Sequence, residues 1–504
     1  MKGGAKSAKA LLRLAAFLMV TLFLIGCLST PSAPKEGVTD TGPAQHGADE
    51  EPLHTSPVFL PGTQPHDIKQ AIASPEVCEG CHGNYEEYAP YDTWGGSMMS
   101  FAAMDPLFLA LNAIANRDLE GVVEVGDYCL RCHAPAPWLE GRSEPVDGSN
   151  LTEQDLEIGV SCDFCHRMVD PLTNEGRELS RPDTTVHGNA QYVVTPVYER
   201  RGPYDDAEAP HPTSYSEFHT KSEICGTCHD IYNPVYDLET PVETTYSEWK
   251  YSAYAEEGVE CQDCHMQPVK GYAAYSGTAK LRDNVYKHEL VGGSSWMPDV
   301  LLWMRDKGYV SFDEERVEAL QRTKVLAVEM LRSAARLDVE ASGGRLKIKV
   351  TNLAGHKLPT GYPEGRRMWL NVRFYDAQGN LIKESGAYDD GTGELAHDPE
   401  LKIYHAEPGM KDVEGYPDGP SFHFALNNHI YFDNRIPPRG FRNADFERRM
   451  AYIRGAEYED GQNWDETEYT IPEGAAKAVV RLRYQSTSKE FVEFLRDENR
   501  GNHW

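Results

Sequence analysis

Ten cysteines of this chain repeat one spacing five times, and no other feature constrains the fold as strongly. Each repeat reads Cys-x-x-Cys-His, and the five lie at Cys78/Cys81/His82, Cys129/Cys132/His133, Cys162/Cys165/His166, Cys225/Cys228/His229 and Cys261/Cys264/His265. This spacing is the attachment motif of c-type haem. Two thiols on one helical turn can each form a thioether with one haem vinyl group, and the adjacent histidine can bind the iron. The sequence therefore predicts five covalently bound haem c groups, with the five histidines as proximal iron ligands.

Other uses of paired cysteines explain the pattern less well. A disulfide scaffold does not place a histidine after every second cysteine, and structural zinc sites do not need that histidine five times. A thioredoxin-like site needs a single motif. The remaining cysteine, Cys27, is the only one outside the motifs.

The spacing of the motifs along the chain also limits the kind of core that can form. Residues 61–300 would hold all five porphyrins. So short a segment cannot build a separate aliphatic core around each group, so the haems must pack against one another. Close packing of redox groups in turn predicts fast electron transfer among them.

The N-terminal residues have the features of an export signal. Four basic residues and no acidic one precede residue 14, and residues 14–26 are almost all apolar. This run has the length of the hydrophobic region of a signal peptide and is too short to span a bilayer. The segment ends Leu24-Ile25-Gly26-Cys27, which resembles a bacterial lipobox, in which the cysteine is lipidated. We predict a lipoprotein signal peptide at residues 1–26 and lipidation of Cys27, with an ordinary signal peptide as the alternative. Residues 27–60, rich in small, polar and proline residues, are predicted to be a flexible tether.

The charge of the chain excludes some partners. It has 49 basic and 79 acidic residues and a net charge of −30, and loss of a signal peptide with four basic residues would bring this to −34. Nucleic-acid binding requires lysine and arginine patches, and so does attraction to anionic lipid. An acidic surface would instead attract basic redox partner proteins and raise their association rates.

Residues from about 70 to 300 resemble the multihaem cytochromes of the cytochrome c-552/c-554 type. The resemblance rests on the motifs and their surroundings, notably GVSCDFCH at 159–166 and GVECQDCHM at 258–266. It implies periplasmic or surface electron transfer, usually with two axial histidines per haem. This chain departs from the family in size, because the tetrahaem members are shorter and lack a long C-terminal extension.

An internal repeat accompanies two of the motifs. It reads Tyr-x-x-Trp-x-x-Ser, and its copies are Tyr91/Trp94/Ser97 and Tyr246/Trp249/Ser252, with the three side chains on one helical face. In the resembled family, a Trp-x-x-Ser-x-His element often supplies a distal ligand. Here that histidine position holds Met99 in the first copy and Tyr254 in the second. Met99 as a ligand would raise the potential of its haem, and Tyr254 could leave an iron open. Alternatively, both are packing residues.

Histidines outside the motifs are candidates for the distal ligands. His187, His219 and His288 are the leading candidates because each lies close to a motif in the sequence, and His66 and His211 are further candidates. Any of them could instead have a surface or hydrogen-bonding role.

No cysteine follows Cys264, and the pattern of the chain changes in this tail. Ser311-x-x-Glu314 predicts a capping box that opens a helix to about Arg336. Alternating apolar residues then predict strands, with glycine-containing turns between them, at Leu346–Val350, Leu370–Phe374 and Val480–Tyr484. We expect a helical connector at 301–336 and an antiparallel β-sandwich of immunoglobulin-like type at 337–504.

A loop in this tail carries a further candidate ligand. The sequence GHKLPTG at 355–361, followed by Arg366-Arg367-Met368-Trp369, resembles an element in the C-terminal regions of multihaem cytochromes, and residues 433–440 resemble a second such element. The resemblance implies that His356 docks against the haem domain and can donate a distal ligand to it. A surface histidine is the alternative. Arg366 and Arg367 could pair with haem propionates or with surface carboxylates.

The expected fold is multidomain: a mostly helical and coil multihaem cytochrome c domain at 61–300, followed by the all-β domain. The favoured function is electron relay in the cell envelope between periplasmic or membrane donors and an acceptor, with no catalytic residue assigned. An oxidoreductase acting on a nitrogen or sulfur compound is the alternative, and it requires one haem with an open distal site. A third option is a haem filament subunit or a scaffold.

The residue after Cys27 bears on the location of the protein. It is Leu28, and not the aspartate associated with inner-membrane retention in enteric bacteria, which favours the outer membrane. A complex in that membrane is an open option.

Overall fold

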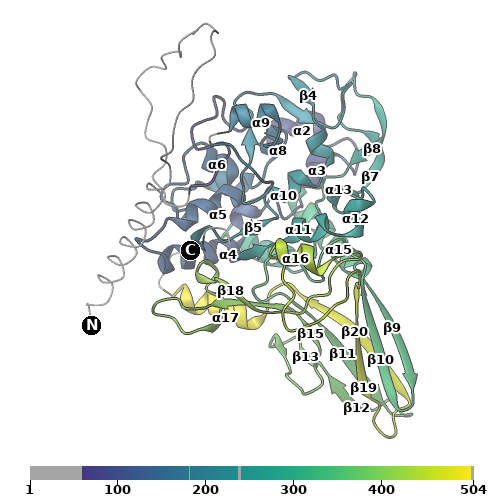
Figure 1. Ribbon diagram of the computed structural model, residues 1–504. Coiled ribbons are helices and arrows are strands. Elements are labelled where there is room, and N and C mark those ends of the chain that lie inside the picture. The colour runs from purple at the N-terminus through teal and green to yellow at the C-terminus, as the bar shows by residue number, and fades with distance from the viewer. Residues whose placement is uncertain (1–58, 181, 237–239, 501–504) are drawn as a thin grey trace, which may run out of the picture. The chain divides into compact units, whose positions relative to one another are not determined.

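The computed structural model describes residues 59–180, 182–236 and 240–500 (Figure 1). The predicted signal peptide, the lipidation site Cys27 and nearly all of the predicted tether lie outside these residues. Within the described ranges, no helix is both long enough and apolar enough to cross a membrane.

Short helices and turns dominate the chain up to residue 333 (Figure 1). The helices are α2 (Glu76–His82), α3 (Pro90–Trp94), η1 (Ala102–Met104), α4 (Pro106–Asp118), α5 (Val125–His133), α6 (Pro135–Leu139), α7 (Glu153–Ile158), α8 (Cys162–Cys165), α9 (Asn174–Leu179), η2 (Glu217–Thr220), α10 (Glu223–Gly226), η3 (Pro234–Tyr236), α11 (Thr245–Lys250), α12 (Ala253–Glu256), α13 (Cys261–His265), α14 (Met297–Asp306) and α15 (Glu314–Ser333). Each Cys-x-x-Cys-His motif overlaps one of them, namely α2, α5, α8, α10 or α13. A single turn is enough to bring the two thiols of a motif to the same face.

Four two-stranded sheets lie between these helices. Their strands are β1 (Met168–Val169) with β2 (Val193–Val194), β3 (Arg200–Gly202) with β4 (Thr213–Tyr215), β5 (Ile231–Tyr232) with β6 (Pro241–Glu243), and β7 (Pro268–Tyr272) with β8 (Leu281–Tyr286). The β3–β4 pair is parallel and the other three are antiparallel. The β3–β4 pair contacts the third motif, because the Arg201 N–H donates to His166 O at 2.6 Å.

The predicted helix of the tail is present, but its predicted cap is wrong. The N-cap of α15 is Asp313, whose carboxylate accepts the main-chain N–H of Arg316 at 2.8 Å. Ser311 lies two residues too early to reach that N–H group. The helix ends at Ser333, three residues before the predicted end, because β9 begins at Ala335.

The chain after α15 is rich in small antiparallel sheets (Figure 1). Its elements are β9 (Ala335–Ser342), β10 (Arg345–Asn352), β11 (Arg367–Tyr375), β12 (Leu381–Ser385), β13 (Tyr388–Asp389), β14 (Glu394–Leu395), β15 (Ile403–Tyr404), β16 (Ala406–Met410), β17 (Gly419–Pro420), η4 (Phe424–Leu426), β18 (His429–Asp433), α16 (Asn443–Arg448), β19 (Trp464–Thr470), β20 (Lys477–Gln485) and α17 (Lys489–Glu498). The three predicted strands are confirmed as β10, β11 and β20. Strand β10 pairs with β9 and β19, and β11 pairs with β20, β12 and β15.

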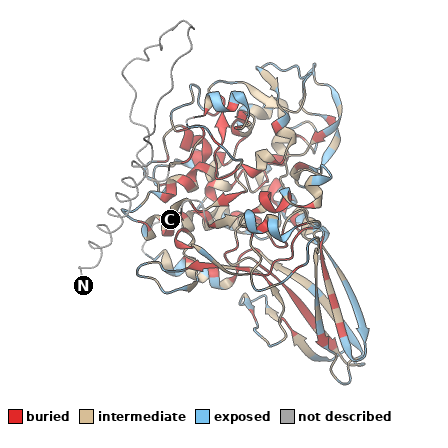
Figure 2. Cartoon of the chain, in the orientation of Figure 1, coloured by how far each residue is buried: buried red, intermediate tan, exposed pale blue. Residues whose placement is uncertain are grey.

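The two larger sheets share one apolar core. Alternate residues of β10 (Leu346, Ile348 and Val350) contact Leu370 and Val372 of β11, and all five are buried. The period-two pattern in the sequence arises from this packing. Figure 2 shows buried residues through the helical region and along these strands.

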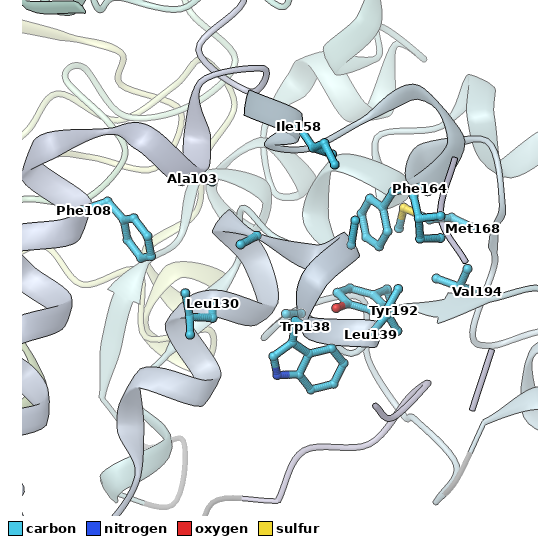
Figure 3. Packing of buried hydrophobic residues seen from close by; sticks show 14 of the residues in the cluster. Ala103, Phe108, Leu130, Trp138, Leu139, Ile158, Phe164, Met168, Tyr192 and Val194 are labelled. Atoms are coloured by element: carbon cyan, nitrogen blue, oxygen red, sulfur yellow. The ribbon is translucent and has the colours of Figure 1, made fainter. Parts of the chain in front are cut away.

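The largest apolar cluster of the helical region surrounds the second and third motifs (Figure 3). Tyr192 is its centre, with edge-to-face contacts to Phe164 at 4.9 Å and to Trp138 at 6.0 Å between ring centres. Phe164 is one of the two variable residues of the third motif, so the motif itself is part of the core. Cys129, Cys132 and Cys165 pack against the same cluster.

Candidate functional site

All five Cys-x-x-Cys-His motifs face one partly open cavity of about 1590 Å³. Every cysteine and histidine of the motifs is among its lining residues, and all ten thiols are free. The lining is mostly aromatic and aliphatic, with additional side chains from the β-rich tail. An apolar, continuous cavity with thiols and imidazoles on its wall fits several covalently attached porphyrins in contact with one another.

The five motif histidines are oriented in the same way. The Nδ1 atoms of four of them lie within hydrogen-bond distance of main-chain carbonyls: His82 of Ala273 O (2.9 Å), His133 of Ala102 O (3.2 Å), His166 of Arg201 O (2.6 Å) and His265 of Val291 O. The fifth, His229, directs Nδ1 at Glu243 Oε1, 2.9 Å away. A proton on Nδ1 leaves Nε2 unprotonated, which is the form that binds iron. The histidines therefore fit the predicted role as axial ligands.

Cysteines of different motifs lie next to one another. Thiols of different motifs approach one another in three pairs, namely Cys78 with Cys162, Cys132 with Cys228, and Cys225 with Cys261. The first motif is thus adjacent to the third, and the fourth is adjacent to both the second and the fifth. This arrangement agrees with the expectation that groups bound to the motifs touch one another.

The repeat found in the sequence is also a repeat in three dimensions. Trp94 Nε1 donates to Val160 O at 2.9 Å, and Trp249 Nε1 donates to Val259 O at 2.9 Å. Each of these valines lies two residues before the first cysteine of a motif. In both copies the valine N–H also returns a 2.9 Å bond to the main chain, at the carbonyl of Met99 or of Tyr254. The Tyr-x-x-Trp-x-x-Ser element therefore fixes the entrance to the third and the fifth motif.

Within the described ranges, four histidines outside the motifs line the cavity: His211, His219, His288 and His356. The ring centre of His288 lies 6.1 Å from that of His166, and His356 lies 6.3 Å from His265. Nδ1 of His288 contacts Tyr286 O at 2.9 Å, and Nδ1 of His356 contacts Lys357 O at 3.0 Å. The Nε2 atoms of His288 and His356 therefore remain available to bind a metal.

His219 is the third of these histidines near a motif. Its ring centre lies 5.3 Å from that of His166, but its Nδ1 contacts Ser216 Oγ at 2.9 Å and its Nε2 contacts Cys165 O at 3.0 Å. Burial lowers the pKa values of His219 and His288 to about 3, which keeps both imidazoles neutral. Neutral imidazole is the form that a metal requires.

The structure does not bring His187 or His66 to the cavity. His187 Nε2 contacts Asp170 Oδ1 at 2.9 Å, and its ring packs against Phe218. His66 packs against Gly141 instead. Met99 and Tyr254 both line the cavity. The Tyr254 hydroxyl, however, donates to Leu353 O at 2.7 Å, which joins the second repeat to the GHKLPTG loop.

A buried group of four charges holds that loop in place, and no sequence motif predicts this group. Lys357 is fully buried, and its Nζ lies 2.7 Å from Asp433 Oδ2. Arg435 binds the same carboxylate through two bonds of 2.9 and 2.6 Å. Glu248, on α11 of the second repeat, accepts the Lys357 N–H at 3.0 Å and the Thr360 hydroxyl at 2.6 Å. These bonds fix the loop that carries His356 to the element that supports the fifth motif.

The two arginines after the loop have different positions. Arg366 lines the cavity and donates to Thr360 O at 2.7 Å, while its buried Nε has no hydrogen-bond partner within the described residues. Arg367 turns away from the cavity and binds Gln485 Oε1 at 2.8 Å. Of these two arginines, Arg366 is therefore the one placed to bind an acidic group in the cavity.

Comparison with known proteins agrees with this site. Residues 77–167, which include the first three motifs, match the family described as cytochrome c554 and c-prime. Among solved structures, the chain is similar to a penta-heme cytochrome c552 from Thermochromatium tepidum, with a TM-score of 0.51 and 18% identity over 84% of this chain and 94% of that chain. That coverage extends beyond the helical region, so the fold likeness includes part of the β-rich tail. No curated protein matches the chain.

Five haem-attachment motifs line the cavity, and the first three lie in the segment that matches the cytochrome c554 and c-prime family. The motifs and the cavity they share are those of a multihaem c-type cytochrome.

Proposed function

We propose that the chain is a pentahaem cytochrome that relays electrons in the cell envelope. The observation that carries this proposal is the joint lining of one cavity by all five motifs, with three pairs of neighbouring thiols between motifs. The name of the structural neighbour, a penta-heme cytochrome, agrees with the count of five. When bound, the haems supply one-electron redox chemistry. The chain's own residues attach them, provide axial nitrogen ligands and exclude water from the space between them.

We also propose distal ligands for two of the irons. Two metal–nitrogen bonds of about 2 Å, plus the distance from each nitrogen to its ring centre, place two axial imidazoles with centres about 6 Å apart. The pairs His265/His356 and His166/His288 have centres 6.3 and 6.1 Å apart and ring planes inclined by 23° and 29°. His356 is thus the proposed distal ligand of the fifth haem, donated from the β-rich tail, and His288 that of the third. His211 also lines the cavity, as does His219, whose two ring nitrogens contact Ser216 and Cys165 instead. His187 is no part of the proposal because it lies outside the cavity.

The location of the protein is a further part of the proposal. A lipid on Cys27 would hold the mature chain at a membrane, which we propose to be the outer membrane. The chain would face either the periplasm or the cell surface. The net charge of −34 expected for that chain favours basic redox partner proteins. The β-rich tail, proposed as an immunoglobulin-like sandwich at 337–504, would contribute His356 and is a surface for complex formation in that membrane.

One observation favours an enzyme as the second candidate. The described cavity offers four histidines outside the motifs to five irons, so at least one iron lacks a distal histidine from this set. Among the residues that the structure describes, no second histidine ring stacks near His133, whose face is covered by Phe108 at 3.8 Å between ring centres. An oxidoreductase acting on a nitrogen or sulfur compound would need such an open iron.

Electron paramagnetic resonance of the oxidised protein separates the two candidates. A carrier with all irons six-coordinate gives only low-spin signals, and addition of nitrite or hydroxylamine leaves them unchanged. A high-spin signal that shifts with either compound would support the enzyme.

A further inference from the structure

The fourth motif differs from the other four in the group that its histidine meets. The Nδ1 atoms of His82, His133, His166 and His265 contact main-chain carbonyls, which carry no charge. His229 Nδ1 lies 2.9 Å from Oε1 of Glu243, a carboxylate. Nothing in the Cys-x-x-Cys-His pattern distinguishes this motif, because the difference is fourteen residues further along the chain.

The contact is built into the local fold. Strand β5 starts two residues after His229 and pairs with β6, and Ile231 is opposite Glu243 in this ladder. The hairpin therefore places Glu243 beside the Nδ1 atom of His229. The Tyr246 N–H donates to His229 O at 3.0 Å and fixes the same segment from the other side.

Other residues keep the carboxylate in position. Thr245 Oγ1 donates to Glu243 Oε1 at 3.3 Å, and Thr245 Oγ1 is itself 2.9 Å from Thr360 Oγ1 in the GHKLPTG loop.

We propose that Glu243 is a positioning residue that lowers the reduction potential of the haem at the fourth motif. A carboxylate that accepts the Nδ1 proton makes the imidazole a stronger donor through Nε2, and its negative charge stabilises ferric over ferrous iron. The four haems whose histidines face neutral carbonyls lack this stabilisation. The fourth haem thus differs in potential from neighbours bound by the same sequence motif. This inference rests on the proposed binding of a haem iron by His229.

The fourth motif is also central among the motifs. Its two cysteines are neighbours of Cys132 in the second motif and of Cys261 in the fifth motif. A low potential makes reduction of the fourth haem by a neighbouring haem less favourable. Glu243 would thereby set the rate of electron transfer between the second and the fifth haem through the fourth.

The test is a spectroscopic redox titration of the holoprotein with Glu243→Gln. The amide has the same shape and can still accept the His229 proton, but it has no charge. One haem is expected to become about tenfold easier to reduce, which is about 59 mV for one electron, and its low-spin electron paramagnetic resonance signal is expected to shift. The matched control is Glu257→Gln, which removes a half-exposed carboxylate paired with Arg439 and should change neither.

The results separate this inference from the proposed function. A variant with the full number of haems and unchanged potentials would overturn the role of Glu243 and leave the pentahaem cytochrome intact. Fewer than five haems in the unmodified protein would count against the proposed function instead. If the variant does not take up haem, redox-difference infrared spectra of unmodified protein labelled with ¹³C-glutamate provide the test. A glutamate carboxylate band that changes on haem reduction supports the contact, and spectra without one refute it.

Discussion

Replacing Lys357 by methionine removes one charge from the buried group that holds the GHKLPTG loop. Its Nζ lies 2.7 Å from Asp433 Oδ2, and both side chains are almost inaccessible to water. At an effective dielectric constant of about 20, two unit charges at this distance attract by about 6 kcal/mol. Arg435 remains bound to Asp433 in the variant, so part of the compensation is kept. We expect a loss of about 3 kcal/mol in the free energy of unfolding, the lower end of the range for a broken buried pair.

The assay is urea unfolding followed by far-ultraviolet circular dichroism. Lys347→Met is the matched control, because Lys347 has a bond of equal length, 2.7 Å, to Glu466, with both side chains about 40% exposed. That pair should contribute at most about 1 kcal/mol. The double variant Lys357→Met with Asp433→Asn removes one cation and one anion, so it should lose less than the two single variants combined. Equal losses for Lys357→Met and Lys347→Met would refute the buried charge network.

Three further outcomes are expected. Trp94→Phe and Trp249→Phe each leave a partly buried valine carbonyl unpaired, so both should lose about 1 kcal/mol in urea unfolding, and a loss in only one would contradict the structural repeat. Tyr254→Phe removes a bond to Leu353 rather than an iron ligand, so its haem spectrum should match that of the unmodified protein, and a changed spectrum would restore Tyr254 as a ligand. Burial raises the pKa of Glu364 to about 7, so the native state retains a proton that the unfolded state releases near pH 4.5. Stability should fall as pH rises from about 4.5 to 7, by up to about 3 kcal/mol, and Glu364→Gln should remove that decline; an unchanged slope would contradict it.

The sequence predicted the parts of the site that depend on local spacing. A Cys-x-x-Cys-His motif consists of residues adjacent in the sequence on a single helical turn. All five could therefore be recognised without knowledge of the fold. The strands around Leu346, Leu370 and Val480 were also predictable, because alternate side chains of each face one apolar core. The cap of α15 was misplaced because both Ser311 and Asp313 have suitable side chains, and only the backbone entering the helix decides between them.

The remaining parts of the site depend on contacts between distant residues. Trp94 binds Val160, 66 residues away, and the sequence showed the repeat but not its partner. Lys357 and Asp433 are 76 residues apart, and each alone would suggest a surface charge. Glu243 lies only fourteen residues from His229, but its role depends on the β5–β6 hairpin, which the sequence analysis did not predict.

The central claim is that five haems are attached to one chain, and their number can be measured directly. Intact-mass spectrometry of the purified holoprotein, with a haemochrome assay on the same sample, gives the haems bound per chain. We predict five haems per chain, and all five remain attached after denaturation because thioether bonds hold them. Four or fewer per chain, or haems released on denaturation, would contradict it.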